Sequence, residues 1–327
     1  MKVTVAVGNK MMIASQSNRK KDSFAFRLWR ASRPYSYPAA IVPVAISTVV
    51  AQFIFPDLKL HFFDFTLVLL GCIGAQAISN LVNDLVDFKT GIDTAEGPGR
   101  KSALIDGSIT FREMVYSVLA IGLVSLAIGI YFSLEVGLLI LVLVIVSGIL
   151  AVEYTAPPLK LKYHALGDIA VFVSFGVAMV FGTYMVIAFR ERHWLEPYAL
   201  SRLALYNFPN VLLVVAILHA NNHRDREKDR KLGGATLANK MSFSSSKNLL
   251  YWLLIGSYVI TAVSILAGWM VWTEAIVFFS LPQLLRILRP FKTDDYSKSV
   301  PMIAKFHGQF GLLMTLGIVL QIAILRY

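Results

Sequence analysis

Asparagine and aspartate residues gather in two groups, each directly after a long apolar stretch. The first group consists of Asn80, Asn83, Asp84 and Asp87, and the second of Asn221, Asp225 and Asp229. Within each group neighbouring members stand one to four residues apart, at spacings that a helix presents on one face. Each apolar stretch is therefore predicted to be a helix that ends in a stripe of oxygen-bearing side chains.

Carboxylates crowded at the C-terminal end of a helix are unfavourable, because they meet the negative end of the helix dipole and repel each other. A divalent cation would relieve both penalties, and Mg²⁺ commonly binds one or two carboxylates together with substrate phosphates. A solvated loop after a helix would explain one such group, but two groups with similar spacing favour a metal site. The predicted magnesium ligands are Asn83, Asp84, Asp87, Asn221, Asp225 and Asp229.

Two such stripes facing each other would hold a diphosphate between magnesium ions, and neighbouring basic side chains would contact the remaining phosphate oxygens. The predicted diphosphate-binding residues are Asn80, Asn83, Lys160, Lys162, Asn221 and Arg224. The two lysines also have a simpler explanation, since basic residues are common on the cytosolic side of membrane helices.

The composition indicates that these residues are carried by a membrane protein. Hydrophobic residues make up 56% of the 327 residues and charged residues only 16%, whereas soluble domains carry about 25% charged residues. The single cysteine, Cys72, excludes a disulfide framework and a cysteine-based metal site.

Nine apolar segments are long enough, or nearly so, to cross a bilayer, which takes about 20 residues per helix. They are 38–56, 64–83, 113–133, 136–154, 168–189, 205–221, 248–269, 271–285 and 306–325. The two stripes follow the second and the sixth segments, which suggests an internal duplication of four helices plus four with a ninth added. We therefore predict an all-α, multi-pass bundle of about nine transmembrane helices in a 4+4+1 arrangement.

Basic residues are distributed unevenly over the loops. With the N-terminus placed in the cytosol, 26 of the 31 lysines and arginines lie on the cytosolic side, as the positive-inside rule requires. The net charge of +11 is then explained by topology, and a nucleic-acid partner is not expected. Both stripes fall on the cytosolic side, where the mouth of the site is predicted. Residues 1–26 are predicted to form a flexible polar tail, and 27–327 a single transmembrane domain.

At these residues the sequence resembles the UbiA superfamily of intramembrane prenyltransferases. Its two Asp-rich motifs are matched by Asn80–Asp87 and Asn221–Asp229, and a third feature by the stretch 154–163 followed by 166–168. Arg33-Pro34, before the first apolar segment, also fits, and the resemblance extends from about residue 27 to the end. It implies a prenyltransferase whose site lies under a cap on the cytosolic side.

Within the superfamily, the stretches 80–100 and 221–238 are most similar to the branch that prenylates 1,4-dihydroxy-2-naphthoate. This resemblance implies Mg²⁺-dependent transfer of a polyprenyl group with loss of CO₂, as in menaquinone (vitamin K2) biosynthesis. Other acceptors stay open, namely 4-hydroxybenzoate, homogentisate or a glyceryl phosphate. The alternative from another class is a cation-coupled transporter, whose carboxylates would normally lie within the bilayer.

The implied chemistry is an electrophilic aromatic substitution, with an allylic cation formed as the diphosphate leaves. The predicted catalytic residues are the aspartates Asp84, Asp87, Asp225 and Asp229, and Tyr154. A tyrosine ring face attracts positive charge, although Tyr154 is equally explained as an interfacial anchor. Asp168 is left open between a helix N-cap and a site residue. His219 and His223 are expected to be structural.

Overall fold

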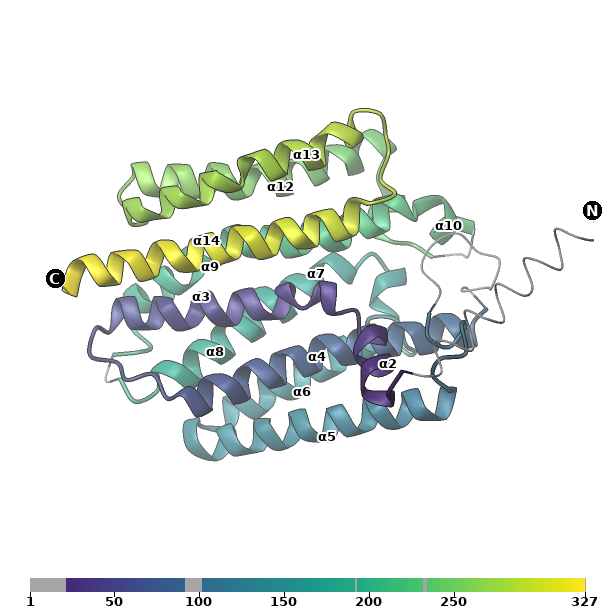
Figure 1. Ribbon diagram of the computed structural model, residues 1–327, viewed down its shortest axis with the longest axis horizontal. Helices are drawn as coiled ribbons and strands as arrows, with labels where there is room; N and C mark the ends of the chain where they lie inside the picture. Colours follow the sequence, from purple (N-terminus) through teal and green to yellow (C-terminus); the bar gives the residue numbers. More distant parts are fainter. Residues whose placement is uncertain (1–21, 92–101, 192, 232–233, 327) are drawn as a thin grey trace, which may run out of the picture.

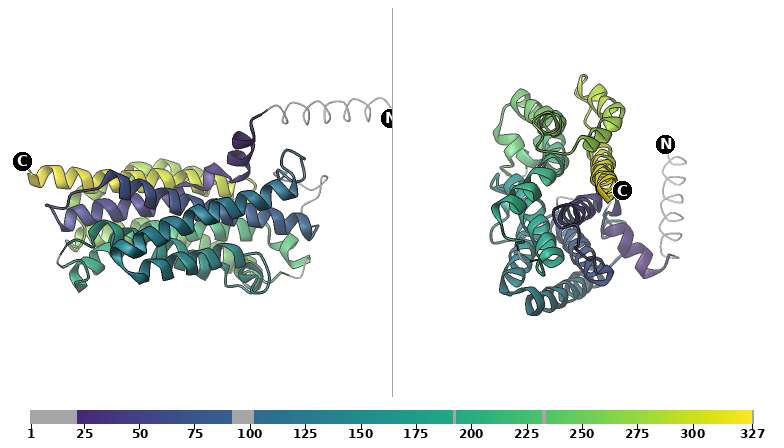
Figure 2. Two further views of the ribbon diagram at one scale, coloured as in Figure 1. Left: turned by 90° about the horizontal axis from the view of Figure 1, so that it is seen from below. Right: turned by 90° about the vertical axis from the view of Figure 1, so that its left-hand side faces the viewer.

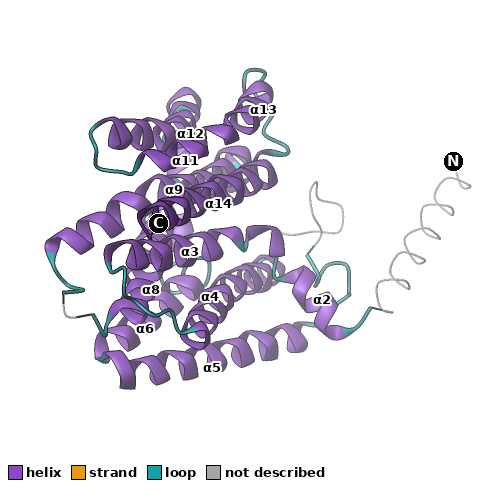
Figure 3. Cartoon of the chain, turned by 60° about the vertical axis from the view of Figure 1, so that its left-hand side comes forward, coloured by secondary structure: helices purple, strands orange, loops and turns teal. Residues whose placement is uncertain are grey.

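The computed structural model describes residues 22–91, 102–191, 193–231 and 234–326 of the chain. These residues form helices and connecting turns, and within them no strand is present beyond one isolated bridge between His164 and Ala235 (Figure 3). The helices that precede and carry the first motif are α2 (Phe24–Ala31), η1 (Pro34–Ser36), α3 (Pro38–Ile54) and α4 (Phe62–Lys89). They are followed by α5 (Phe111–Val136), α6 (Leu138–Glu153), η2 (Leu161–Tyr163), α7 (Gly167–Val171), η3 (Phe172–Ala178) and α8 (Met179–Ala188).

The second half of the chain is also built mainly of long helices. It contains α9 (Pro197–Arg224), α10 (Arg226–Lys231), α11 (Leu237–Lys240), α12 (Phe243–Leu266), η4 (Trp272–Ser280), α13 (Leu281–Phe291) and α14 (Ser299–Arg326). In the described residues seven helical segments are long and apolar enough to cross a membrane, with α7, η3 and α8 forming one of them. The shorter α6 and the consecutive η4 and α13 complete nine segments. The predicted all-α, multi-pass membrane fold is confirmed.

The long helices run roughly parallel or antiparallel to one another, so the molecule has two distinct ends (Figures 1 and 2). The short helices α2 and α10 lie at one end, and the C-terminus lies at the other. This arrangement brings the last turns of α4 and α9 to the same end, although they are far apart in the sequence. The N-terminal residues 1–21, most of the predicted tail, lie outside the described residues, and α2 begins at Phe24 with Ser23 as its N-cap.

Two helix boundaries differ from the sequence prediction. α4 continues past residue 83 to Lys89, so the whole first motif is helical. α9 begins at Pro197 rather than near 205, because proline is well suited to the first turn of a helix. It then passes through Pro209 without ending, as membrane helices often do when neighbours satisfy the freed backbone group.

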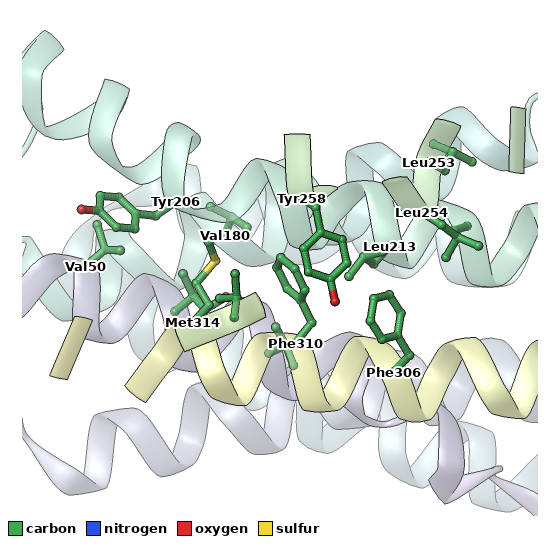
Figure 4. Close-up of a cluster of buried hydrophobic side chains, with 14 of the residues drawn as sticks. Val50, Val180, Tyr206, Leu213, Leu253, Leu254, Tyr258, Phe306, Phe310 and Met314 are labelled. Carbon is green, nitrogen blue, oxygen red and sulfur yellow. The ribbon is translucent and has the colours of Figure 1, made fainter. Parts of the chain in front are cut away.

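The main hydrophobic core joins α3, α9, α12 and α14. Tyr258, Phe306 and Phe310 pack against one another in this core, with ring centroids 5.2–6.1 Å apart (Figure 4). α14 approaches α3 closely at Gly311, where an added Cβ would lie 2.3 Å from a methyl carbon of Val42. This packing of a glycine against a branched side chain is typical of membrane helix interfaces.

Candidate active site

The first Asp-rich stripe lies on the last two turns of α4, against the turn that follows α2. Asp84 is fully buried and accepts a hydrogen bond from the Arg33 guanidinium. Its second carboxylate oxygen, Oδ2, is buried and has no hydrogen-bond partner among the described residues. Asn83 donates a hydrogen bond of 2.9 Å to Asp87 Oδ2. Of the three predicted metal ligands on α4, Asn83 and Asp87 therefore bond each other, and Asp84 pairs with the Arg33 cation.

Asn80 holds the turn that presents Arg33. Its amide nitrogen donates to the Ser32 carbonyl at 2.9 Å and to Ser36 Oγ at 3.0 Å. Between these two residues Arg33 adopts a left-handed backbone conformation, with φ of 58°, which is uncommon for a residue other than glycine. Two residues of α4 therefore hold this turn: Asn80 bonds its flanking residues, and Asp84 pairs with the Arg33 side chain.

The second stripe crosses a break between two helices. α9 ends at Arg224 and α10 begins at Arg226, so the predicted stripe does not lie on one continuous helix. Asp225 is the C-terminal cap of α9. The helical spacing survives the break, because the Asp225 amide donates to Asn221 O at 3.0 Å and the Asp229 amide to Asp225 O at 2.8 Å.

Arg224 binds the side chains of its own motif. Its Nε and Nη2 donate to the two carboxylate oxygens of Asp225 at 2.8 and 2.7 Å, and Nη2 also donates to Asn221 Oδ1 at 2.8 Å. This bidentate geometry is the strong form of an arginine–carboxylate pair. The guanidinium is about one-third exposed, so it lies at the surface of the site.

Asp229 and Lys162 form a second, more buried pair. Lys162 Nζ lies 3.7 Å from Asp229 Oδ1 and 5.2 Å from the centre of the Tyr163 ring. Burial raises the pKa of Asp229, and the charge of Lys162 offsets part of this rise. Oδ2 of Asp229 is buried without a hydrogen-bond partner in the described chain. Lys160, by contrast, is exposed.

Tyr154, at the C-terminal end of α6, lies where several carboxylates meet. The charges of Asp168, Asp229 and Asp87, which come from three different helices, all act on its phenol group. Gly167 leaves room for the ring, since an added Cβ there would lie 3.2 Å from Tyr154 Cε2. Tyr154 therefore lies near carboxylates of both motifs.

A cavity begins at Tyr154 and runs between α4, α6 and the α7–η3 segment. Its lining includes Gln76, Ser79, Leu150, Tyr154, Val171 and Phe175. Part of this wall is the π-helical turn Phe172–Ala178, a local distortion that is frequent at functional sites. The cavity is mostly apolar, in contrast to the charged residues near its tyrosine end.

The two motifs are linked electrostatically through Arg33. Its charge attracts Asp84 and Asp87 of the first motif and repels Arg224 of the second. Asp84, Asp225 and Asp229 are each paired with a cation. Within the described residues no three acidic, histidine or cysteine side chains are grouped as ligands of one metal ion. The crowding expected from the sequence is thus relieved in part by arginine and lysine.

Three residues of this region carried little signal in the sequence. In the sequence Arg33 stands out only as part of an Arg-Pro pair, and Asp168 fits both a helix N-cap and a site residue. The structure gives Asp168 no capping hydrogen bond at α7, whose N-cap is Leu166. His219, expected to be structural, is fully buried with its Nδ1 at 3.3 Å from Asp168 Oδ1. Only the folded chain brings α7 and α9 together.

Comparison with known proteins identifies the family. The model of the UbiA prenyltransferase family matches residues 40–321. The chain belongs to the UbiA prenyltransferase family. It is therefore a membrane prenyltransferase, and the stretch that matches contains both Asp-rich motifs and Tyr154.

The similarity to known relatives extends over nearly the whole chain. The 1,4-dihydroxy-2-naphthoate octaprenyltransferase of Bacillus subtilis is 26% identical and covers 94% of this chain and 96% of its own length. The UbiA prenyltransferase domain-containing protein 1 of Xenopus tropicalis is 30% identical over 89% of this chain and 81% of its own. The human protein of the same name is 28% identical over 92% of this chain and 88% of its own length.

Solved structures support the fold. An apo UbiA homologue from Aeropyrum pernix K1 has a TM-score of 0.64 at 14% identity and covers 92% of this chain and 99% of its own. A UbiA homologue from Archaeoglobus fulgidus bound to GPP and Mg²⁺ has a TM-score of 0.62 at 18% identity, and the match covers 91% of this chain and 99% of the homologue. At such identities the likeness establishes the bundle architecture alone.

Proposed function

We propose that this prenyltransferase transfers a polyprenyl group from its diphosphate to 1,4-dihydroxy-2-naphthoate, with loss of CO₂. The observation that carries the proposal is the convergence of both Asp-rich motifs, Lys162 and Tyr154 at one end of the bundle, beside an apolar cavity. The acceptor is supported by the similarity to the Bacillus subtilis octaprenyltransferase, which extends over 94% of the chain.

The residues present fit Mg²⁺. Buried carboxylate oxygens without hydrogen-bond partners, Oδ2 of Asp84 and of Asp229, are hard donors of the kind that this ion prefers. The archaeal homologue bound to GPP and Mg²⁺ adds support for a divalent metal. The proposed ligands are Asn83, Asp84, Asp87, Asn221, Asp225 and Asp229. When bound, Mg²⁺ would supply positive charge to the leaving diphosphate.

The cations of the site are proposed to bind the diphosphate oxygens. Arg33, Lys162 and Arg224 each hold a motif carboxylate in this structure, and phosphate is an equally suitable partner for guanidinium and ammonium groups. Lys160, Asn80, Asn83 and Asn221 were also assigned to the diphosphate from the sequence. Of these, Lys160 is exposed and would act only at the rim of the site.

The allylic group is proposed to lie between Tyr154 and the apolar cavity. As the carbon–oxygen bond of the prenyl diphosphate breaks, its electron pair leaves with the diphosphate and the allyl group becomes cationic. The ring face of Tyr154 attracts this charge, and the apolar lining keeps water from capturing the cation. The carboxyl-bearing ring carbon then forms the new carbon–carbon bond. Its carboxylate departs as CO₂, and the electrons of that bond restore the aromatic ring.

The experiment that tests the acceptor counts CO₂. Purified protein is incubated with MgCl₂, a polyprenyl diphosphate and 1,4-dihydroxy-2-naphthoate labelled in its carboxyl group. We expect one labelled CO₂ for each prenyl group transferred, and little product from carboxyl-labelled 4-hydroxybenzoate. Prenylation of hydroxybenzoate with its label retained, and none of the naphthoate, would refute the acceptor but leave the enzyme class unchanged. The same panel includes homogentisate and a glyceryl phosphate as competing acceptors.

A further inference from the structure

A chain of buried polar side chains leads from the site into the bundle. Asp168 is more than nine-tenths buried, and one of its oxygens, Oδ1, is 3.3 Å from His219 Nδ1. The other ring nitrogen of His219, Nε2, lies 3.0 Å from both the carbonyl and the hydroxyl of Ser246. The Ser246 hydroxyl is in turn 2.8 Å from His223 Nδ1. None of these four residues belongs to the ligands proposed above.

The second oxygen of Asp168 has no such partner. Oδ2 is buried and makes no hydrogen bond within the described residues, although buried carboxylate oxygens are normally satisfied. It belongs to the carboxylate whose charge acts on the Tyr154 phenol. A donor from a bound molecule would satisfy it.

The position of Asp168 indicates which molecule would supply that donor. Asp168 follows Gly167, where an added Cβ would lie 3.6 Å from the Tyr154 hydroxyl oxygen, and it precedes Ala170 and Val171, which line the cavity. It therefore lies at the end of the cavity next to Tyr154, where the allyl group is proposed to react. A hydroxyl on an aromatic acceptor placed there would be within reach of the carboxylate.

We propose that Asp168 Oδ2 accepts a hydrogen bond from a ring hydroxyl of the acceptor, and that His219 is the positioning residue for Asp168. This inference rests on the proposed function. The ring must be electron-rich to attack an allylic cation, and an anionic hydrogen-bond acceptor on its hydroxyl increases the electron density of the ring. His219, held at both nitrogens, keeps Oδ1 occupied and turns Oδ2 toward the substrate.

The first test compares the two substrates in Asp168→Asn. Loss of one charged hydrogen bond should lower kcat/KM for the naphthoate about 10- to 100-fold. Binding of a non-reactive prenyl thiolodiphosphate with MgCl₂ should stay within about twofold of wild type. Asp64→Asn is the matched control, because Asp64 is equally buried but pairs with Arg190. Loss of analogue binding in Asp168→Asn would make Asp168 part of the metal or diphosphate site and overturn the proposal.

The second test changes the substrate instead of the protein. Methyl ethers of each naphthoate hydroxyl are assayed with wild type and with Asp168→Asn. One ether should reduce kcat/KM of the wild type about as much as Asp168→Asn reduces it for the parent acceptor, with little further loss when both changes are combined. Fully additive losses for both ethers would refute a hydrogen bond between Asp168 and the acceptor.

The third test separates positioning from folding. His219→Ala should raise the acceptor KM and leave analogue binding intact, and His219→Gln, which keeps a donor toward Asp168, should recover part of the loss. Ser246→Ala removes the hydroxyl contact of His219 Nε2. It should raise the acceptor KM less than His219→Ala does. Equal losses for both substrates, with no recovery in His219→Gln, would assign His219 a purely structural role. A wild-type protein that binds the analogue but prenylates no acceptor would refute the proposed function itself.

Discussion

At Asp84 and Asp229 the structure pairs an almost fully buried carboxylate with a cation from another element. Arg33 reaches Asp84 from the turn after α2, and Lys162 reaches Asp229 from the turn before α7. A buried pair contributes little net stability, but removing one partner leaves an uncompensated charge. These pairs could not be predicted from the sequence, because the partners are 51 and 67 residues apart. The helical spacing within each motif, in contrast, was visible directly.

Arg33→Met tests the buried pair. It should lower the free energy of unfolding by about 3 kcal/mol, because Asp84 is then buried without a counter-charge. Thermal unfolding in detergent measures the change. The double variant Arg33→Met with Asp84→Asn should be more stable than Arg33→Met alone. A double variant that shows the sum of the two single losses would mean that the pair is not coupled.

Asp225→Asn should act on turnover rather than on folding. The Asp225 side chain is about one-third exposed, so losing its charge should change thermal stability by less than about 0.5 kcal/mol. Prenyl transfer should fall below detection, since the proposed metal loses a ligand, and excess EDTA should do the same to the wild type. Near-normal transfer in Asp225→Asn, or full activity of the wild type in EDTA, would contradict the metal assignment.

At the scale of elements, the helices were largely predictable and their ends were not. In the described part of the chain, seven of the nine predicted segments correspond to helical segments long and apolar enough to cross a membrane. The other two correspond to the shorter α6 and to η4 with α13. The break between α9 and α10 was missed, since the spacing of Asn221, Asp225 and Asp229 continues across it. The π-helical turn Phe172–Ala178 in the fifth segment was also not predicted, because no sequence pattern distinguishes it from an α-helix.

Gly311→Val tests the contact between α14 and α3. The new side chain would overlap Val42, and overpacking of this kind costs about 1–3 kcal/mol. Gly148→Val on α6 is the control, because nothing lies within 4 Å of a Cβ at that position. Thermal unfolding should show a loss for Gly311→Val only, and Val42→Ala should restore part of it. Equal stability of the two glycine variants would contradict the close approach.

For the whole molecule, the loop charges predict an orientation in addition to a fold. The last turns of α4 and α9 lie at the end that carries α2 and α10, and the positive-inside rule predicts that this end faces the cytosol. Single cysteines at the exposed positions Thr90 and Ser244, in a Cys72→Ser background, should react with impermeant reagents from the cytosolic side only. A cysteine at the exposed Ser201 should react from the opposite side. Labelling of Thr90→Cys and Ser244→Cys from different faces would refute a shared site.

The ion pairs of the two motifs have a consequence for the order of binding. Arg33, Lys162 and Arg224 are each already held by a motif carboxylate. In the proposed complex the metal binds the carboxylate of such a pair and the diphosphate binds its cation. Mg²⁺ alone would bind next to a cation that holds the same carboxylate and would be repelled by it, whereas a diphosphate bound with Mg²⁺ would neutralise that cation. Thermodynamic linkage then requires each to tighten the binding of the other by the same factor. Titrations of Mn²⁺, as a Mg²⁺ substitute, should give a dissociation constant at least about tenfold lower with prenyl thiolodiphosphate than without it.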